Sequence, residues 1–386
     1  MMRKFRLGSK LRVGDLVQVR SKEEILSTLD SNGRMDGMPF MPEMFQFCGR
    51  RFRVYKRAHK TCDTVFPIRA RRLSDAVHLE TRCSGDAHGG CQAGCLIFWK
   101  VAWLKRVRPD EPTVEDIQLI TLTRAKSSVC TESRVWECTK VQAEDPQPTY
   151  ICQSTQLPYA TTDLRWWDIR QYLEDYTSGN VGLVTILTAF TNKVVFRLSK
   201  VRVIGWRVRK LYENIAPRFG GPKWPKLRGS IEIGKPTPTK TLDLRPGELV
   251  RVKPHETIIT TVNRGNHNRG MSFDKEMAPY CENEYRVLKR VTKIINERTG
   301  KMQEMRVPSI ILDSVFCQSR YSECRLFCPR SIYAFWREIW LERVPETQHL
   351  ENCQPQPSLD FNEANRVWQL NSEIISDDRR EPQEIR

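Results

Sequence analysis

Long hydrophobic runs are missing from this sequence. No stretch of about 20 apolar residues, the length that crosses a bilayer as a helix, occurs in its 386 residues. The most apolar segment, Val181 to Phe196, is interrupted by three threonines, Asn192 and Lys193. No apolar stretch follows the basic first residues, as it would in a secretory signal peptide. We therefore expect no membrane span and a cytoplasmic location.

Recognised catalytic motifs are also missing. The sequence has no serine nucleophile elbow, no phosphate-binding Gly-Lys-Ser/Thr loop and no G-x-G-x-x-G after a predicted strand. Four thiolates on one metal ion would leave no open position for a substrate. These features favour a protein that is not an enzyme, without deciding the point.

Disulfide bonds are not expected either, although 13 cysteines are present. The count is odd and the reducing cytosol keeps thiols free, so metal ligation explains so many cysteines better. Acidic residues are in deficit, since 46 Asp and Glu face 63 Lys and Arg, which gives a formal net charge of +17. This excess indicates an anionic partner, such as nucleic acid, a phosphorylated polymer or acidic lipid headgroups.

The chain contains a repeat. The pattern L-x-x-G-D/E-L-V-x-V occurs at residues 11–19 and again at 244–252, and a Glu-Met pair followed by a cysteine recurs at 43–48 and 276–281. Self-similarity over about 100 residues, found twice, is typical of domain duplication and not of a solenoid. We predict copy one at residues 8–108, a central segment at 109–239, copy two at 240–345 and a disordered polar tail at 346–386.

The central segment is expected to mix strands and helices. Strands are predicted at 119–124 and 134–140, and a helix is predicted from the N-cap Asp163 to the Ser178-Gly179-Asn180 stop, with a second helix from Gly182 to about Lys200. The fold class is therefore α+β, with two homologous, mainly β domains flanking a mixed α/β segment. The tryptophan pairs 99/103 and 336/340 are predicted to lie in the cores of the two copies.

Each copy carries four cysteines at matching positions, three of them on a loop that leads into an aromatic segment. Four thiolates complete a tetrahedral zinc site or hold an iron–sulfur cluster, whereas free cysteines can also serve as small buried hydrophobes. We predict metal ligation. Zinc is favoured over an iron–sulfur cluster because a closed metal clip stabilises a small domain and no other feature indicates redox chemistry. The predicted ligands are Cys48, Cys83, Cys91 and Cys95 in copy one and Cys281, Cys317, Cys324 and Cys328 in copy two.

Further ligands have weaker support. His59 and His88 could each replace a thiol in copy one, but copy two has no histidine at either place, so both are expected at the solvated surface. A third site in the central segment could consist of Cys130, Cys138 and Cys152. Its fourth ligand would be Cys62 or Cys353.

The most basic part of the chain runs from Lys193 to Arg228, where aromatic residues are interleaved with Lys and Arg. This composition is typical of a surface that follows a phosphate backbone and stacks bases. A solvated helix face followed by a Pro/Gly-rich linker gives the same pattern. The predicted surface for nucleic acid or another polyanion consists of Arg197, Lys200, Arg202, Arg207, Arg209, Lys210 and Trp224.

The motifs of the two copies resemble features of known proteins. The opening strand motif, the Glu-Met-x-x-x-Cys segment, the thiol loop and the Phe-Trp-x-x-x-Trp-Leu close together resemble a group of uncharacterised bacterial proteins with the same doubled layout. The first about ten residues of each copy resemble the opening strand of SH3-like and KOW-type barrels, which commonly bind nucleic acid or protein. The resemblance implies two SH3-like domains and assigns no activity.

Composition and motifs together favour a non-enzymatic, metal-stabilised binding protein with a basic surface for an anionic partner. One alternative is an iron–sulfur protein in electron transfer or as an accessory to an enzyme. Another is a structural protein–protein interaction module without a polyanion partner.

Overall fold

The structure, a computed structural model, describes most of the chain between residues 10 and 345. The described residues are 10–65, 69–108, 130–141, 146–199, 201, 205–215, 228–322 and 324–345, without the side chains of 196, 199, 209, 213 and 215. The predicted tail at 346–386 lies outside them. None of the described helices is long and apolar enough to cross a membrane.

Copy one is built on a five-stranded antiparallel sheet with the strand order β8-β7-β4-β1-β9. In β1, Val17 and Val19 are fully buried, which follows from the apolar alternation of the opening motif. Phe52 and Arg106 pair with Val17 from either side. The strands are β1 (Leu16–Val19), β4 (Arg51–Arg57), β7 (Ala76–Arg82), β8 (Leu96–Lys100) and β9 (Leu104–Arg106).

Copy two has a second five-stranded antiparallel sheet, ordered β18-β17-β16-β13-β19, which matches the first strand for strand. Its strands are β13 (Leu249–Val252), β16 (Glu284–Ile295), β17 (Met302–Phe316), β18 (Tyr333–Trp336) and β19 (Leu341–Arg343). The elements between the strands also correspond. They are α1 (Lys22–Leu26) and α7 (His255–Ile259), the hairpins β2-β3 (Arg34–Met35, Met38–Pro39) and β14-β15 (His267–Asn268, Met271–Ser272), and the 3-10 turns η1 (Pro42–Phe47) and η6 (Ala278–Tyr280).

The tryptophan pairs lie in the two cores, as predicted. All four indoles are fully buried. The indole N–H of Trp103 donates to Thr28 Oγ1 at 3.1 Å, and that of Trp340 donates to Thr261 Oγ1 at 2.9 Å. Trp103 and Trp340 therefore have a hydroxyl partner at the matching position of their own copies, whereas the buried indole nitrogen of Trp336 has none.

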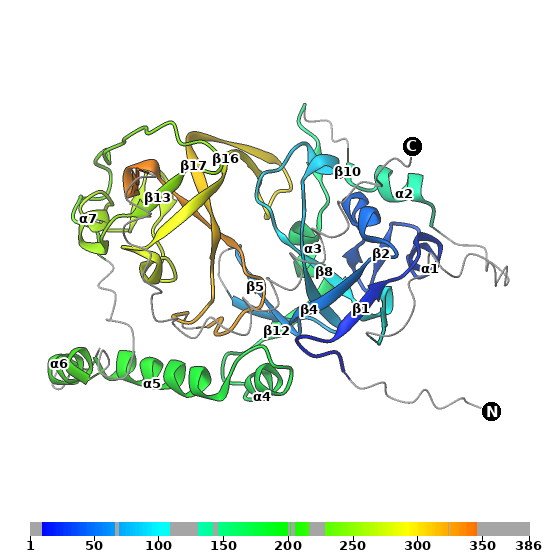
Figure 1. Cartoon of the computed structure of the whole chain (residues 1–386), viewed down its shortest axis with the longest axis horizontal. Coiled ribbons are helices and arrows are strands. Elements are labelled where there is room, and N and C mark those ends of the chain that lie inside the picture. The colour runs from blue at the N-terminus through cyan, green and yellow to red at the C-terminus, as the bar shows by residue number, and fades with distance from the viewer. Residues whose placement is uncertain are drawn as a thin grey trace, which may run out of the picture.

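The central segment contributes helices along one edge of the molecule and a small third sheet (Figure 1). The third sheet pairs β5 (Lys60–Asp63) and β6 (Arg69–Arg72) of copy one with β12 (Thr162–Leu164). The other described elements are α2 (Glu132–Glu137), β10 (Lys140–Val141), β11 (Thr149–Tyr150), α3 (Gln153–Ala160), α4 (Arg170–Thr177), α5 (Leu183–Ser199) and α6 (Gly205–Ile215). The mixed α+β class with antiparallel sheets is thus confirmed.

Two local predictions in the central segment are wrong. The strand predicted at 134–140 is mainly the helix α2, because Thr131 caps it by accepting from the Arg134 amide. Asp163 does not cap a helix, since it lies in β12 and pairs with Arg71 at 2.9 Å. The helix stop at Ser178 and the helix α5 are confirmed, and the strand predicted at 119–124 lies outside the described residues.

The two copies contact each other through their thiol loops. The Gln92 amide of copy one donates to the Lys293 carbonyl of β16 at 3.1 Å. In the other direction, the Arg330 guanidinium of copy two donates to the Cys62 carbonyl of β5 at 3.3 Å. Each loop therefore lies against the hairpin region of the other copy.

Candidate metal centre and basic groove

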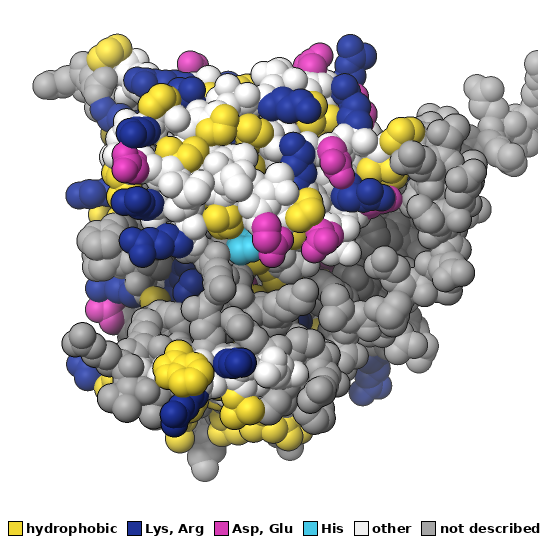
Figure 2. Space-filling view, turned by 90° about the vertical axis from the view of Figure 1, so that its left-hand side faces the viewer, with side chains coloured by type: hydrophobic (Ala, Val, Ile, Leu, Met, Phe, Trp, Pro, Cys, Tyr) yellow, Lys and Arg dark blue, Asp and Glu magenta, His cyan; other side chains and the backbone are white. Residues whose placement is uncertain are grey.

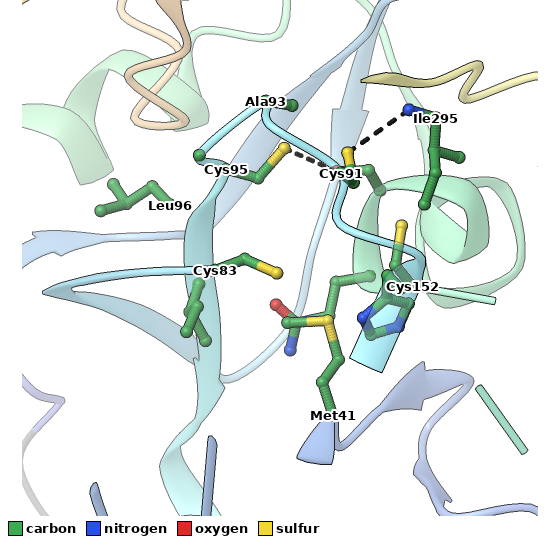
Figure 3. Close-up of a pocket in the computed structure, with 13 residues that line it drawn as sticks. Met41, Cys83, Cys91, Ala93, Cys95, Leu96, Cys152 and Ile295 are labelled. Carbon is green, nitrogen blue, oxygen red and sulfur yellow. Dashed lines mark hydrogen bonds between the residues drawn. The ribbon is translucent and has the colours of Figure 1, made fainter. Parts of the chain in front are cut away.

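Four thiols surround one small cavity at the contact between the copies. Cys83, Cys91 and Cys95 from the loop of copy one and Cys152, which precedes α3, line a cavity of about 30 Å³ (Figure 3). A space of that size holds one water molecule or one ion. Three ligands of the first predicted set are thus brought together, and the fourth thiol comes from the central segment.

The loop can wrap around this cavity because glycine occupies its tightest turn. Gly85 has a φ of +83°, and a Cβ at this position would lie 2.0 Å from the Cys91 carbonyl oxygen. Only glycine fits so close an approach of two backbone segments. Gly85 therefore lets the loop turn so that Cys91 comes back toward Cys83. Such a turn is what a loop that encloses a small site needs.

Burial favours the neutral form of three of these thiols. It raises the pKa of Cys83 far above its ordinary value, raises that of Cys95, and raises that of Cys152 to about 12. The charges of neighbouring thiols add to the shift at Cys83 and Cys152. A bound cation would reverse this preference, because thiolates are the form that ligates metals.

Cys48 does not line the cavity. Burial raises its pKa to about 11, and the charged groups that act on it are Lys22, Glu23 and Glu132. The thiols that line this cavity are therefore those of Cys83, Cys91, Cys95 and Cys152, although no three of their sulfur atoms lie within 4.8 Å of one another. From the sequence alone, Cys152 is a candidate ligand only of the possible third site.

Glu43 anchors the thiol loop from η1. Its Oε1 accepts from His88 Nδ1 at 2.7 Å and from the Ala87 amide at 3.1 Å, and it lies 3.8 Å from Cys83 Sγ. Glu43, Cys83 and His88 form the single group of three or more His, Cys, Asp or Glu ligand atoms within 4.8 Å of one another in the described part of the chain. Neither predicted quartet forms such a group there.

His88 is buried, so its expected surface position is wrong, and the same holds for His59. The second ring nitrogen of His88 lies 3.0 Å from the Ile151 carbonyl oxygen. Because both nitrogens already have partners, His88 could ligate a metal only by giving up one of these contacts. Its geometry therefore fits an anchor of the loop better than a primary ligand.

Copy two repeats this anchor without a histidine. Glu276 accepts from the backbone amides of Arg320 at 3.0 Å and Tyr321 at 2.6 Å. Burial raises the pKa of Glu276 to about 7. Sequence reasoning missed the role of both glutamates, although the recurring Glu-Met pair was a signal that could have found them.

A second group of thiols crosses the same boundary between copies. Cys62 of β5 hydrogen-bonds Cys328, and this contact lowers the pKa of Cys62 to about 6, whereas burial raises that of Cys328. Cys317 lies close enough for its charge to act on Cys328. Cys324 lines a separate groove with Arg325, and the charges acting on Cys281 are those of Glu282 and Glu256.

The predicted polyanion residues are only partly described. Arg197, Arg207 and Lys210 are exposed on α5 and α6. Arg209 belongs to α6, but its side chain is not described, and Lys200, Arg202 and Trp224 lie outside the described residues.

A strongly basic groove lies elsewhere, between copy one and α4. It has a volume of about 750 Å³. Its carboxylates are Asp15, which pairs with Arg106 at 2.5 Å, and Glu174, which pairs with Arg57 at 2.8 Å. The cations outnumber them, since the groove is lined by Lys10, Arg12, Arg57, Arg106 and Arg170.

Comparison with known proteins adds no assignment. No known protein family matches the chain, and no curated protein is significantly similar to it in sequence. The resemblance to a duplicated bacterial family and to SH3-like barrels therefore stays a prediction.

Proposed function

We propose that this protein is a non-enzymatic binding protein, stabilised by metal, that presents a basic surface to an anionic partner. The observation that carries the proposal is the basic groove, in which five cations face two carboxylates. Concave surfaces lined by one sign of charge concentrate ligands of the opposite sign. The net charge of +17 supports the same partner class.

The groove has the chemistry of a phosphate-binding surface. Arginine side chains donate in a fork that matches phosphate oxygens. Lys10 adds a point charge whose side chain is 71% exposed and lies 3.6 Å from Glu174. Arg170 is 79% exposed in its side chain, so it can reach a partner while Asp168 holds it. Phosphate groups of nucleic acid or of a phosphorylated polymer fit this arrangement.

Zinc is the metal we propose, with Cys83, Cys91, Cys95 and Cys152 as ligands. The cavity among these thiols has room for one ion, and four thiolates would complete its tetrahedral shell if their sulfur atoms, no three of which lie within 4.8 Å of one another, moved closer around it. Because Cys152 belongs to the central segment and Ile295 of copy two lines the same cavity, such an ion would join three parts of the chain. An iron–sulfur cluster is the alternative occupant of four thiolates.

The SH3-like assignment of the two copies also belongs to this proposal. What supports it is the shared strand order and the position of β1 and β13 inside each sheet, next to the closing strands β9 and β19. Small barrels of this kind commonly present a binding surface, which is an argument by analogy.

Retention on heparin and on single-stranded oligonucleotide tests the anionic partner. Removing a phosphate contact lowers the slope of log affinity against log salt by about 1, so Lys10→Glu with Arg12→Glu should elute at clearly lower salt than wild type. Lys235→Glu with Arg264→Glu, which changes the same charge on exposed residues outside the groove, is the matched control. If both variants eluted at the same salt concentration, the groove would not be the surface that binds the anionic partner.

Metal analysis combined with an absorption spectrum tests the cofactor. Zinc in a colourless protein supports the proposal, whereas visible absorbance in anaerobically purified protein supports a cluster. Protein that contains neither metal after purification with zinc present would contradict both.

A further inference from the structure

The outer face of α5 is apolar and exposed. The inner face of this helix packs Ile186 and Ala189 against Phe327 of copy two. On the other side, Val184 is 76% and Leu187 is 59% exposed. The outward positions repeat at helical spacing, and Arg197 near the end of the helix is the one charged residue among the exposed described side chains of α5. The other exposed positions are Leu183, Val184, Leu187, Thr188, Thr191, Val194 and Leu198.

The neighbouring helices continue this exposed apolar surface. Ile169, Leu173 and Tyr176 follow one face of α4 and the turn before it, and Trp206 and Leu211 are exposed on α6. Of the 17 large hydrophobic side chains exposed in the described residues, 12 lie between positions 167 and 211. Figure 1 places the three helices in a row along one edge, so we name their exposed apolar side chains the helical edge. Exposed apolar surface concentrated in this way marks a binding surface.

Three threonine hydroxyls beside the helical edge already have partners within their own helices. Thr177, Thr188 and Thr191 each donate to the backbone carbonyl four residues earlier, at 2.9, 2.8 and 2.9 Å. A threonine that bonds its own helix presents only its methyl group to the surroundings. The edge can therefore enter an apolar phase without leaving these donors unsatisfied.

Cations accompany the apolar side chains. No carboxylate is exposed among the described side chains of α4, α5 and α6, because Asp175 is buried and Glu174 is half-buried beside Arg57. Figure 2 shows hydrophobic and basic side chains together at the lower edge of the molecule. The exposed cations in and next to these helices are Arg165, Arg170, Arg197, Arg207 and Lys210.

We propose that the helical edge docks the protein on the surface of a bilayer that contains anionic lipids. Apolar side chains with Trp and Tyr on one face and cations beside them are the features of helices that lie in a membrane interface. Nucleic acid would use the cations but leave the apolar face uncovered. The inference rests on the proposed function for the anionic class of partner and goes beyond it by adding a second surface, whose ligand is lipid phosphate.

Sedimentation with vesicles tests this proposal on the full chain. Wild type should bind vesicles of phosphatidylcholine with phosphatidylglycerol at least about tenfold more tightly than vesicles of phosphatidylcholine alone. Val184→Asp with Leu187→Asp should weaken binding to the anionic vesicles at least about tenfold, because two charges would enter the interface. Ile233→Asp with Leu288→Asp is the matched control, since both residues are exposed hydrophobics outside the helical edge, and it should bind like wild type.

Two results would overturn the inference. One is vesicle binding by the Val184/Leu187 variant that equals wild type. The other is a wild-type dimer that this variant converts to a monomer, which would make the helical edge a contact between two copies of the chain. Heparin retention separates the two proposals, because the Val184/Leu187 variant keeps all groove cations and should elute like wild type. If wild type bound heparin but did not bind the anionic vesicles, the proposed function would stand and docking on a lipid surface would be rejected.

Discussion

The backbone amide of Ile295 lies 3.3 Å from Cys91 Sγ and donates a hydrogen bond to it, although the two residues belong to different copies. In the repeat, Ile295 occupies the position of Cys62, and Cys62 in turn contacts Cys328 of the other copy. Each thiol loop is thus closed by the hairpin region of the opposite copy. Cys91, Cys62 and Cys328 thus lie at the boundary between the copies, whereas Cys48 and Cys281 pack in the cores of their own copies.

Replacing Cys152 should therefore remove metal from the first cavity. We expect Cys152→Ser to lower the zinc content by about one ion per chain, because a tetrahedral site needs four ligands. A chelator should lower the melting temperature of wild type and leave that of the variant almost unchanged, which differential scanning fluorimetry can measure. Cys48→Ser is the control, since Cys48 lies outside the cavity. Equal zinc loss in both variants would contradict the assignment.

The buried ion pair between Lys60 and Asp175 should be a major determinant of stability. Nζ of Lys60 lies 2.5 Å from Asp175 and 2.8 Å from the Leu326 carbonyl oxygen, and both charged side chains are almost fully buried. Asp175→Ala should cost about 3–5 kcal/mol in the free energy of unfolding, because a buried ammonium loses its partner. Urea denaturation measures this change.

The exposed pair of Lys235 and Glu232 provides the control for that experiment. Glu232→Ala should change the free energy of unfolding by less than about 1 kcal/mol, since solvent screens exposed pairs. The double variant Lys60→Met with Asp175→Leu should regain part of the stability lost in Asp175→Ala. A loss below about 1 kcal/mol for Asp175→Ala would show that the pair does not hold α4 on copy one.

Acid should destabilise the protein through His78 of β7. Its Nδ1 lies 2.8 Å from the Ile97 carbonyl oxygen, its Nε2 is buried, and burial lowers its pKa to about 3. The unfolded chain binds a proton near pH 6.5, whereas the folded chain does not until about pH 3. Stability from this group is therefore present above pH 6.5 and falls by about 1.4 kcal/mol per unit as the pH drops toward 3.

Unfolding in urea between pH 4 and 7 measures this dependence. His78→Phe should be less steep over this range than wild type, whatever its absolute stability, because the variant has no imidazole to protonate. His267→Phe is the control, since His267 is exposed in β14. An unchanged slope for His78→Phe would show that His78 is not the group responsible.

The two anchoring glutamates should stabilise the two thiol loops alike. Glu43→Ala would leave the Ala87 amide and His88 Nδ1 without their acceptor, and Glu276→Ala would do the same to the amides of Arg320 and Tyr321. Each substitution should lower the free energy of unfolding by about 1–3 kcal/mol. Limited proteolysis of the two loops, with the exposed Glu304→Ala as control, should show faster cleavage in each variant. Resistance equal to wild type would exclude an anchoring role.

Local pattern was enough to predict several features of the fold. The alternating valines of β1, the buried tryptophan pairs, the helix α5 with its stop before it, and the mixed α+β class all depend on short-range spacing, which the sequence states directly. The basic composition can likewise be counted from the sequence, and none of the described helices is long and apolar enough to cross a membrane. The prediction for Asp163 was wrong because this residue lies in β12, which pairs with the distant strand β6. Short-range spacing does not show such pairing.

Cysteines, glycines and a Glu-Met pair recur in the two copies, and this recurrence is visible in the sequence alone. Which side chains meet depends on how the folded copies pack against each other. The first thiol cavity replaces Cys48 by Cys152, and the second group takes Cys62 from the opposite copy, because the two copies pack loop against hairpin. Contacts between residues far apart in the chain depend on how whole domains pack, and spacing along one copy contains no information about the other.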